Sequence, residues 1–193
     1  MSRSPHMIVL GGPNGAGKST AAAFLLPPTL TFINADNVAK SLPGYPSKQV
    51  DREAARVVLQ NMRQLGQAGT DFAVETTLAS RSLAKRIRQL KESGYLLRLL
   101  FLFLTDVELA IHRVAQRVRE GGHDIPEETI RRRFMAGIQN LFGLYLPLAD
   151  KWTIFETSGI TLPRLIAEGV RDGEQRIHDL ETWQDLWNRG HEA

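Results

Sequence analysis

A chain of 193 residues is long enough for one well-buried core and short for two, so we expect a single domain over residues 1–193. Hydrophobic residues make up 42% of the chain and charged residues 23%, which excludes wholesale disorder, and the longest apolar stretch, residues 95–104, is too short to cross a membrane. The net charge is only +3, and the basic residues concentrate in a group of arginines between residues 113 and 133, which favours a local anion site over a nucleic-acid surface.

The chain contains no cysteine, which excludes disulfides, thiol nucleophiles and zinc sites built on cysteine. The apolar run before the first glycines, residues 8–10, is too short for a secretory signal. We therefore expect a cytoplasmic protein with neither a membrane nor a nucleic-acid partner.

Apolar runs alternate with amphipathic segments along the chain, which predicts a parallel sheet with helices on both faces. Strands are expected near residues 6–11, 31–35, 71–75, 97–104 and 152–156. Helices are expected near residues 17–25, 47–66, 80–93 and 106–119.

Two further helical regions are expected outside this alternation. After Gly121-Gly122, residues 124–127 have the pattern of a capping box, which predicts a helix to about residue 140. Residues 113–140 would then form a helical lid inserted before the last strand. The tail at about 161–193 has a helical pattern, and we expect it to dock on the core.

A phosphate-binding loop follows the first predicted strand and precedes the first helix. The spacing G-x-x-x-x-G-K-[ST] predicts a P-loop that binds ATP and Mg²⁺. Its glycines let backbone N–H groups converge on phosphate oxygens, the lysine neutralises the β- and γ-phosphates, and Ser19 offers its hydroxyl to Mg²⁺. The expected cofactor-binding residues are Gly12, Pro13, Asn14, Gly15, Ala16, Gly17, Lys18, Ser19 and Thr20.

The loop alone leaves open whether ATP is hydrolysed or its phosphoryl group is transferred, because cassette ATPases carry the same string. The chain shows no LSGGQ-like signature and no apolar run ending in Asp-Glu. Asp106, after the run at residues 102–104, fits a Walker B aspartate or a helix cap equally well.

Carboxylates stand where two predicted strands end, and open α/β sheets bind ligands at that edge. Asn34 and Asp36 follow the second strand, and Asp36 is the candidate base that takes the proton of an acceptor hydroxyl. The alternative is a local Asn-Ala-Asp-Asn turn.

The third strand ends in Glu75, Thr76 and Thr77, which we expect to bind the acceptor. A charged residue in a parallel strand needs a partner. Arg81 is either that partner, in a salt bridge to Glu75, or a further acceptor-binding residue.

Arginines supply the third signal. Arg113 and Arg117 are four residues apart, share one helix face and are expected to stabilise the transferring phosphoryl group when the lid closes. Arg119, Arg131 and Arg133 are further candidates. The alternative for any single one of these arginines is that it belongs to a solvated basic helix pair. Arg132 points away from the apolar stripe, and His123 is expected to be structural.

These residues resemble the zeta toxins and their small zeta-like relatives, over residues 8–158. The strings that carry the resemblance are GGPNGAGKST, INAD, VETTLASRS, GGHDIPEETIRRRF and NLFGLYLPLAD. The resemblance implies an α/β P-loop fold like that of nucleoside monophosphate kinases, with a five-stranded parallel sheet in the order 2-3-1-4-5. It also implies phosphorylation of UDP-N-acetylglucosamine by ATP and Mg²⁺.

The resemblance assigns roles to particular positions. Lys18 matches the Walker lysine, Asp36 the aspartate base, and Glu75 with Thr76 the acceptor-binding region; Arg113 aligns best with the phosphate-binding arginines of the lid. The chain is shorter than the well-known toxins, and GGHDIP is typical of the small relatives. Toxicity and a cognate antitoxin are implied by the wider family alone.

Three interpretations follow, in order of preference. The first is a zeta-like kinase of a nucleotide sugar, the second a kinase of another small acceptor such as a nucleotide, and the third a P-loop ATPase that acts as a switch. Only the third predicts ATP turnover that is insensitive to any small acceptor.

Overall fold

A seven-stranded sheet in the order β2-β3-β1-β4-β5-β6-β7 forms the centre of the protein. The computed structural model describes residues 3–159 and 162–192. The first five strands in sequence are parallel, so the predicted strand order 2-3-1-4-5 is confirmed. They are β1 (His6–Gly11), β2 (Thr31–Ile33), β3 (Phe72–Thr76), β4 (Leu96–Phe103) and β5 (Lys151–Glu156).

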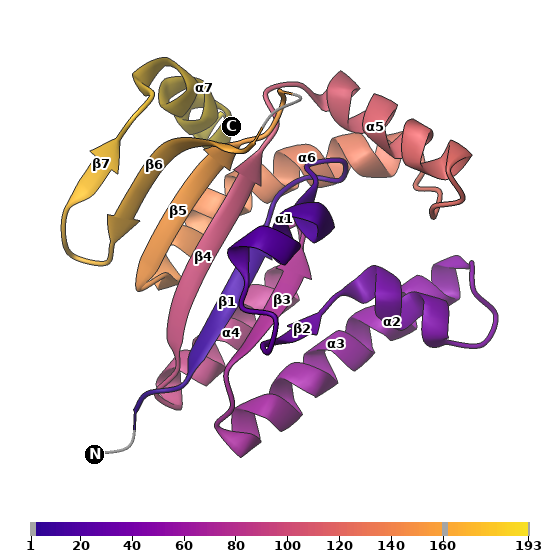
Figure 1. The fold of residues 1–193 in the computed structure, drawn as a ribbon, viewed down its shortest axis with the longest axis horizontal. Coiled ribbons are helices and arrows are strands. Elements are labelled where there is room, and N and C mark those ends of the chain that lie inside the picture. Colours follow the sequence, from indigo (N-terminus) through magenta and orange to yellow (C-terminus); the bar gives the residue numbers. More distant parts are fainter. Residues whose placement is uncertain (1–2, 160–161, 193) are drawn as a thin grey trace.

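Helices cover both faces of the sheet, with α1 on one face and α4 and α6 on the other (Figure 1). α5 and α6 form the hairpin that we call the lid. The helices are α1 (Lys18–Leu25), α2 (Ala35–Ser41), α3 (Lys48–Ala68), α4 (Arg81–Glu92), α5 (Val107–Arg119), α6 (Glu127–Asn140) and α7 (Leu180–His191), and a π turn (Leu141–Tyr145) and a 3₁₀ turn (Leu146–Leu148) follow α6. None of the helices in the described ranges combines the length and the apolarity that crossing a bilayer requires.

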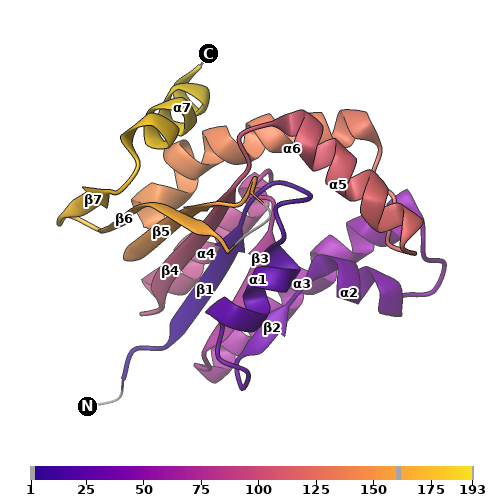
Figure 2. The ribbon, with the colours of Figure 1, turned by 45° about the horizontal axis from the view of Figure 1, so that its top comes forward.

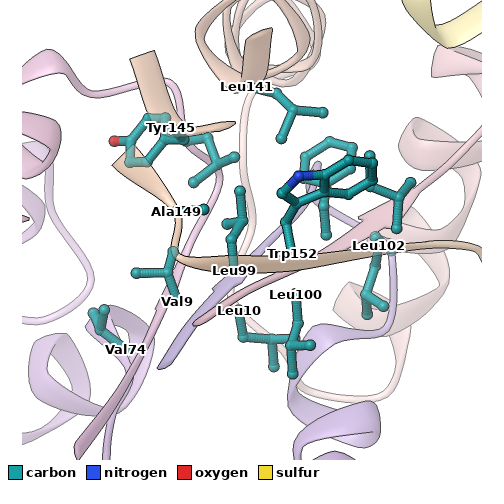
Figure 3. Packing of buried hydrophobic residues seen from close by; sticks show 14 of the residues in the cluster. Val9, Leu10, Val74, Leu99, Leu100, Leu102, Leu141, Tyr145, Ala149 and Trp152 are labelled. Atoms are coloured by element: carbon teal, nitrogen blue, oxygen red, sulfur yellow. The ribbon is translucent and has the colours of Figure 1, made fainter. Parts of the chain in front are cut away.

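The central strands are apolar on both faces because both faces are covered. Figure 3 shows the consequence at β4: Leu99 points to the side of Leu141 and Tyr145, whereas Leu100 points to the opposite side with Leu10. Tyr145 is fully buried and donates its hydroxyl proton to the carbonyl of Ser80 at 2.7 Å. The π turn is thereby fixed to the start of α4.

The prediction of an entirely helical tail is wrong. β6 (Arg164–Val170) and β7 (Gln175–Ile177) extend the sheet antiparallel to β5, and only α7 is helical. The reason is the free edge of β5, which offers backbone hydrogen bonds to a segment with a buried apolar pair, Ile166 and Ala167. Gly169 lets β6 approach Trp152, since a Cβ there would lie 2.5 Å from the Trp152 ring.

Two local features differ from the predictions, and one open alternative is decided. α2 was not expected, and it begins because the Asn34 side chain accepts the N–H groups of Asp36 and Asn37. Asp124 forms no capping box, since Pro126 is the N-cap of α6 and no side chain caps it. Asp106 accepts the N–H of Glu108 at 2.9 Å, so it acts as the helix cap of α5.

Asp150 joins α4, β4 and the β6–β7 turn to the start of β5. Its carboxylate accepts the N–H of Leu97 at 2.7 Å and pairs with Lys91 and Arg171. Burial alone would raise the pKa of Asp150, but the Lys91 ammonium, the Leu97 N–H and the Arg171 guanidinium together hold that pKa below its usual value.

We predict that Asp150→Asn lowers the free energy of unfolding by about 1–3 kcal/mol at neutral pH, because it leaves charged and N–H donors without an anionic partner. The depressed pKa means that this stabilisation is complete above the unfolded-state pKa of about 3.9 and is lost as pH falls through the folded-state value. Urea unfolding at several pH values measures it. Asp172→Asn, on the exposed turn between β6 and β7, is the matched control; equal stability of both variants at neutral pH would contradict the assignment.

Candidate active site

The loop between β1 and α1 has a backbone that only glycine adopts readily. Gly12, Gly15 and Gly17 have φ values of 146°, 78° and 73°. A Cβ on Gly12 would lie 2.4 Å from the Leu102 carbonyl oxygen, and one on Gly15 would lie 2.8 Å from that of Ala110. β4 and α5 therefore press directly against the loop and fix its shape.

The start of α1 fits a phosphate chain. Its first turn carries no acidic residue and no side chain caps it, so no capping side chain occupies the N–H groups at the positive end of the helix dipole. Gly17 faces open space, because a Cβ there would meet no atom within 4 Å. Lys18 and Ser19 open this helix, so a bound ATP-Mg²⁺ would be held by its N–H groups, by Lys18 and by the Ser19 hydroxyl.

Lys18 is a buried ammonium that donates to the carbonyl of Pro13 at 2.9 Å. Burial lowers the pKa of Lys18, whereas the carboxylates of Glu75 and Asp36 raise it. The Glu75 Oε1 atom lies 3.8 Å from Nζ. Glu75 thus lies beside the predicted lysine, and Asp36 adds to the negative charge that acts on it.

Glu75 is held by the loop and by the end of β2. Its Oε2 accepts the Ser19 hydroxyl at 2.8 Å and the Asn34 amide at 2.6 Å. Lys18, Ser19, Asn34 and Glu75 therefore form one polar network, in which Glu75 has three partners. Arg81 is exposed, and among the described residues it forms no hydrogen bond or ion pair, so the structure does not bring it to Glu75.

Thr76 and Thr77 turn the chain away from the strand end. The Thr76 hydroxyl accepts the N–H of Leu78 at 3.0 Å, and Leu78 is buried in the left-handed region at φ 59°. Thr77 packs closely under α6, since a Cβ on Gly137 would lie 2.4 Å from its carbonyl oxygen. Thr76 directly follows Glu75 at the end of β3, and Thr20 lies in the first turn of α1.

Asp36 lies in the first turn of α2 with its carboxylate half exposed. Asn34 makes the local side-chain hydrogen bonds of the turn, which leaves the Asp36 carboxylate outside them. Its Oδ2 lies 3.7 Å from Nη1 of Arg117, on the lid. Asp36 therefore faces the lid.

Arg113 contacts backbone carbonyls. Nη1 donates to Thr157 at 2.8 Å and to Gly15 at 3.4 Å, and Nη2 donates to Ser158 at 2.9 Å and to Gly159 at 3.2 Å. The guanidinium thus ties the P-loop to the segment after β5. These bonds occupy both Nη groups, so the expected contact with phosphate would fall to the Nε–H group or would require some of these bonds to break.

The remaining arginines separate into two groups. Arg117 and Arg133 face the site: both lower the pKa of Lys18 by their positive charge, and burial lowers the pKa of Arg133 itself. Arg131 instead pairs with glutamates of α5 and α6, and Arg119 and Arg132 are exposed. Arg133 was left undecided by the sequence, where the only signal was its position beside the apolar stripe of α6.

A model of the zeta toxin family matches residues 1–179. The chain belongs to the zeta toxin family. An uncharacterized protein of Haemophilus influenzae is 28% identical to it over 123 residues, which are 64% of this chain and 88% of that protein. The predicted family membership is therefore confirmed.

Solved structures share the fold of this zeta toxin family member. The crystal structure of AvrRxo1-ORF1:-ORF2 with ATP superposes with a TM-score of 0.76 at 20% identity over 98% of this chain, which spans 65% of that neighbour. The PezAT toxin–antitoxin system of Streptococcus pneumoniae gives 0.63 at 20% identity, over 97% of this chain and 86% of that one. A putative kinase from Chloroflexus aurantiacus gives 0.55 at 15% identity, over 69% and 78%. The fold is that of P-loop kinases.

We predict that Arg113→Gln lowers the free energy of unfolding by about 1–3 kcal/mol in the absence of nucleotide, because several carbonyls lose a charged donor. Arg119→Gln, an exposed arginine on the same helix, should change it by no more than about 0.5 kcal/mol. Urea unfolding compares the two. Equal stabilities would mean that the Arg113 guanidinium does not hold these carbonyls in solution.

Proposed function

We propose that this zeta toxin family member is an ATP-dependent kinase that transfers the γ-phosphoryl group to a hydroxyl of a small molecule. The observation that carries the proposal is the position of Asp36: its half-exposed carboxylate lies 3.7 Å from Arg117 of the lid, and its charge acts on the P-loop lysine. A carboxylate there can take the proton of an attacking hydroxyl as the phosphoryl group arrives. Water would need the same base, so the preference for a small-molecule hydroxyl over water is supported by the zeta toxin family.

Each group has a role in the proposal. Bound ATP-Mg²⁺ supplies the transferable phosphoryl group. Asp36 orients the acceptor hydroxyl and takes its proton at the carboxylate, while Lys18, Arg117 and Arg133 offset negative charge on the phosphates. Glu75 orients the Ser19 hydroxyl and opposes the lowering of the Lys18 pKa that burial causes. Arg113 fixes the shape of the P-loop.

The acceptor in this proposal is UDP-N-acetylglucosamine, on the strength of the family alone. Asn34, Glu75 and Thr76 are the residues proposed to contact it, with Thr77 and Arg81 nearby. The family also supports a cognate antitoxin as a protein partner, as in the PezAT toxin–antitoxin system. We place the enzyme in the cytoplasm, where ATP is available.

We predict that Asp36→Asn abolishes acceptor-dependent phosphotransfer while ATP affinity stays within about twofold of the wild type, because the amide cannot take a proton and the P-loop is untouched. ADP release is measured with and without UDP-N-acetylglucosamine, and ATP binding is measured by calorimetry.

Two controls make the outcome specific. Asp124→Asn makes the same change on an exposed carboxylate that has no ion pair or hydrogen bond among the described residues, and it should leave both quantities unchanged. Lys18→Ala should abolish ATP binding itself. Full phosphotransfer by Asp36→Asn would remove Asp36 from the base role.

A further inference from the structure

The turn between α5 and α6, residues 121–125, is the part of the GGHDIP string that the proposed function leaves unexplained. It is tight because Gly121 has φ 87° and the N–H of Gly122 donates to the Arg117 carbonyl at 2.8 Å. A Cβ on Gly122 would lie 2.6 Å from the Arg117 side chain. Ile125 is buried and anchors the turn at its far end. The two glycines thus let the chain fold back closely over Arg117.

This tight turn places the His123 side chain against the α2–α3 connection and the start of α3, which lie across the site from the lid. Its ring lies 5.3 Å from the ring of Tyr45, in the α2–α3 connection, and its Nε2 lies 3.8 Å from Oδ1 of Asp51, in the first turn of α3. Only 16% of its side chain is exposed, although it stands in a turn at the end of the lid. Figures 1 and 2 both place this turn next to the α2–α3 connection.

The backbone of the same residue holds Arg117. Nη2 of Arg117 donates to the His123 carbonyl at 3.1 Å, and Nη1 lies 3.7 Å from Asp36. His123 therefore has two connections: its side chain contacts Tyr45 and Asp51 on the acceptor side, and its carbonyl fixes the arginine that faces the proposed base.

We propose that His123 is a positioning residue that fastens the end of α5 to the α2–α3 connection and thereby holds Arg117 against Asp36. Its effect on catalysis rests on the proposed function, whereas the fastening itself does not. Without the His123 side chain, the lid end loses its contacts with Tyr45 and Asp51, and the Arg117 guanidinium loses its fixed distance from Asp36. The GGHDI sequence then fastens the end of the lid to the α2–α3 connection and the start of α3. We call this contact of His123 with Tyr45 and Asp51 the latch.

The fastening can be measured as a distance, because the chain has no cysteine of its own. Spin labels are attached at Arg63→Cys on α3 and Arg119→Cys on α5, both exposed positions, and pulsed dipolar spectroscopy is recorded without ligand and with ATP-Mg²⁺. We expect one narrow distance distribution in the labelled parent, and a broader distribution with a longer mean distance after His123→Ala. Asp51→Asn, which leaves the turn intact, should broaden it in the same direction.

The matched control is His112→Ala, an exposed histidine of α5 that makes no hydrogen bond or ion pair in the described part of the chain. It should leave the distribution unchanged. Unchanged distributions for His123→Ala and Asp51→Asn, in variants with the parent's circular dichroism, would overturn the latch whatever the enzyme phosphorylates.

The positioning role has a separate readout in phosphotransfer. His123→Ala should lower kcat by up to roughly 10²-fold and leave the KM for ATP nearly unchanged. Because His123 acts through Arg117, the double variant with Arg117→Ala should be no slower than Arg117→Ala alone. Additive losses would show that His123 does not act through Arg117.

Discussion

The buried ammonium of Lys18 is the charge that the rest of the site must stabilise. An ammonium taken out of water costs several kcal/mol unless anions and carbonyls surround it. β1 and β3 pair in parallel with Leu10 opposite Glu75, so the carboxylate arrives beside the loop as a consequence of strand register. Asn34 at the end of β2 then fixes the same carboxylate and caps α2. Strand order, loop shape and the position of Asp36 are thus connected through one charged network.

Two arginines of the lid are held by different partners. Arg113 and Arg117 lie one turn apart on α5, yet the first is held by carbonyls of the P-loop and of the segment after β5, while the second reaches Asp36. The first holds the shape of the P-loop, and the second lies beside Asp36. This division explains why a helix rich in arginine need not place every guanidinium on phosphate.

Much of the fold could be predicted from local patterns, and less of the site. The apolar runs of β1, β3, β4 and β5 and the P-loop spacing are visible in the sequence because each is fixed by neighbours in the chain. β6 was missed because it depends on the free edge of β5, and α2 because a short helix depends on one capping side chain, that of Asn34. The network of Glu75 was only half foreseen: its need for a partner was clear, but the partners proved to be Lys18, Ser19 and Asn34 rather than Arg81. No local pattern shows that His123 meets Asp51, since the two are far apart in the sequence.

The proposed reaction transfers the γ-phosphoryl group of ATP to a hydroxyl of a small molecule. The most direct test incubates the protein and Mg²⁺ with a metabolite extract and ATP labelled with ¹⁸O in its γ-phosphoryl group, followed by mass spectrometry. We expect one metabolite to gain a labelled phosphoryl group, and we expect this product to be absent with Lys18→Ala. Label recovered in inorganic phosphate alone would instead identify the protein as a hydrolysing ATPase and exclude the proposed transfer.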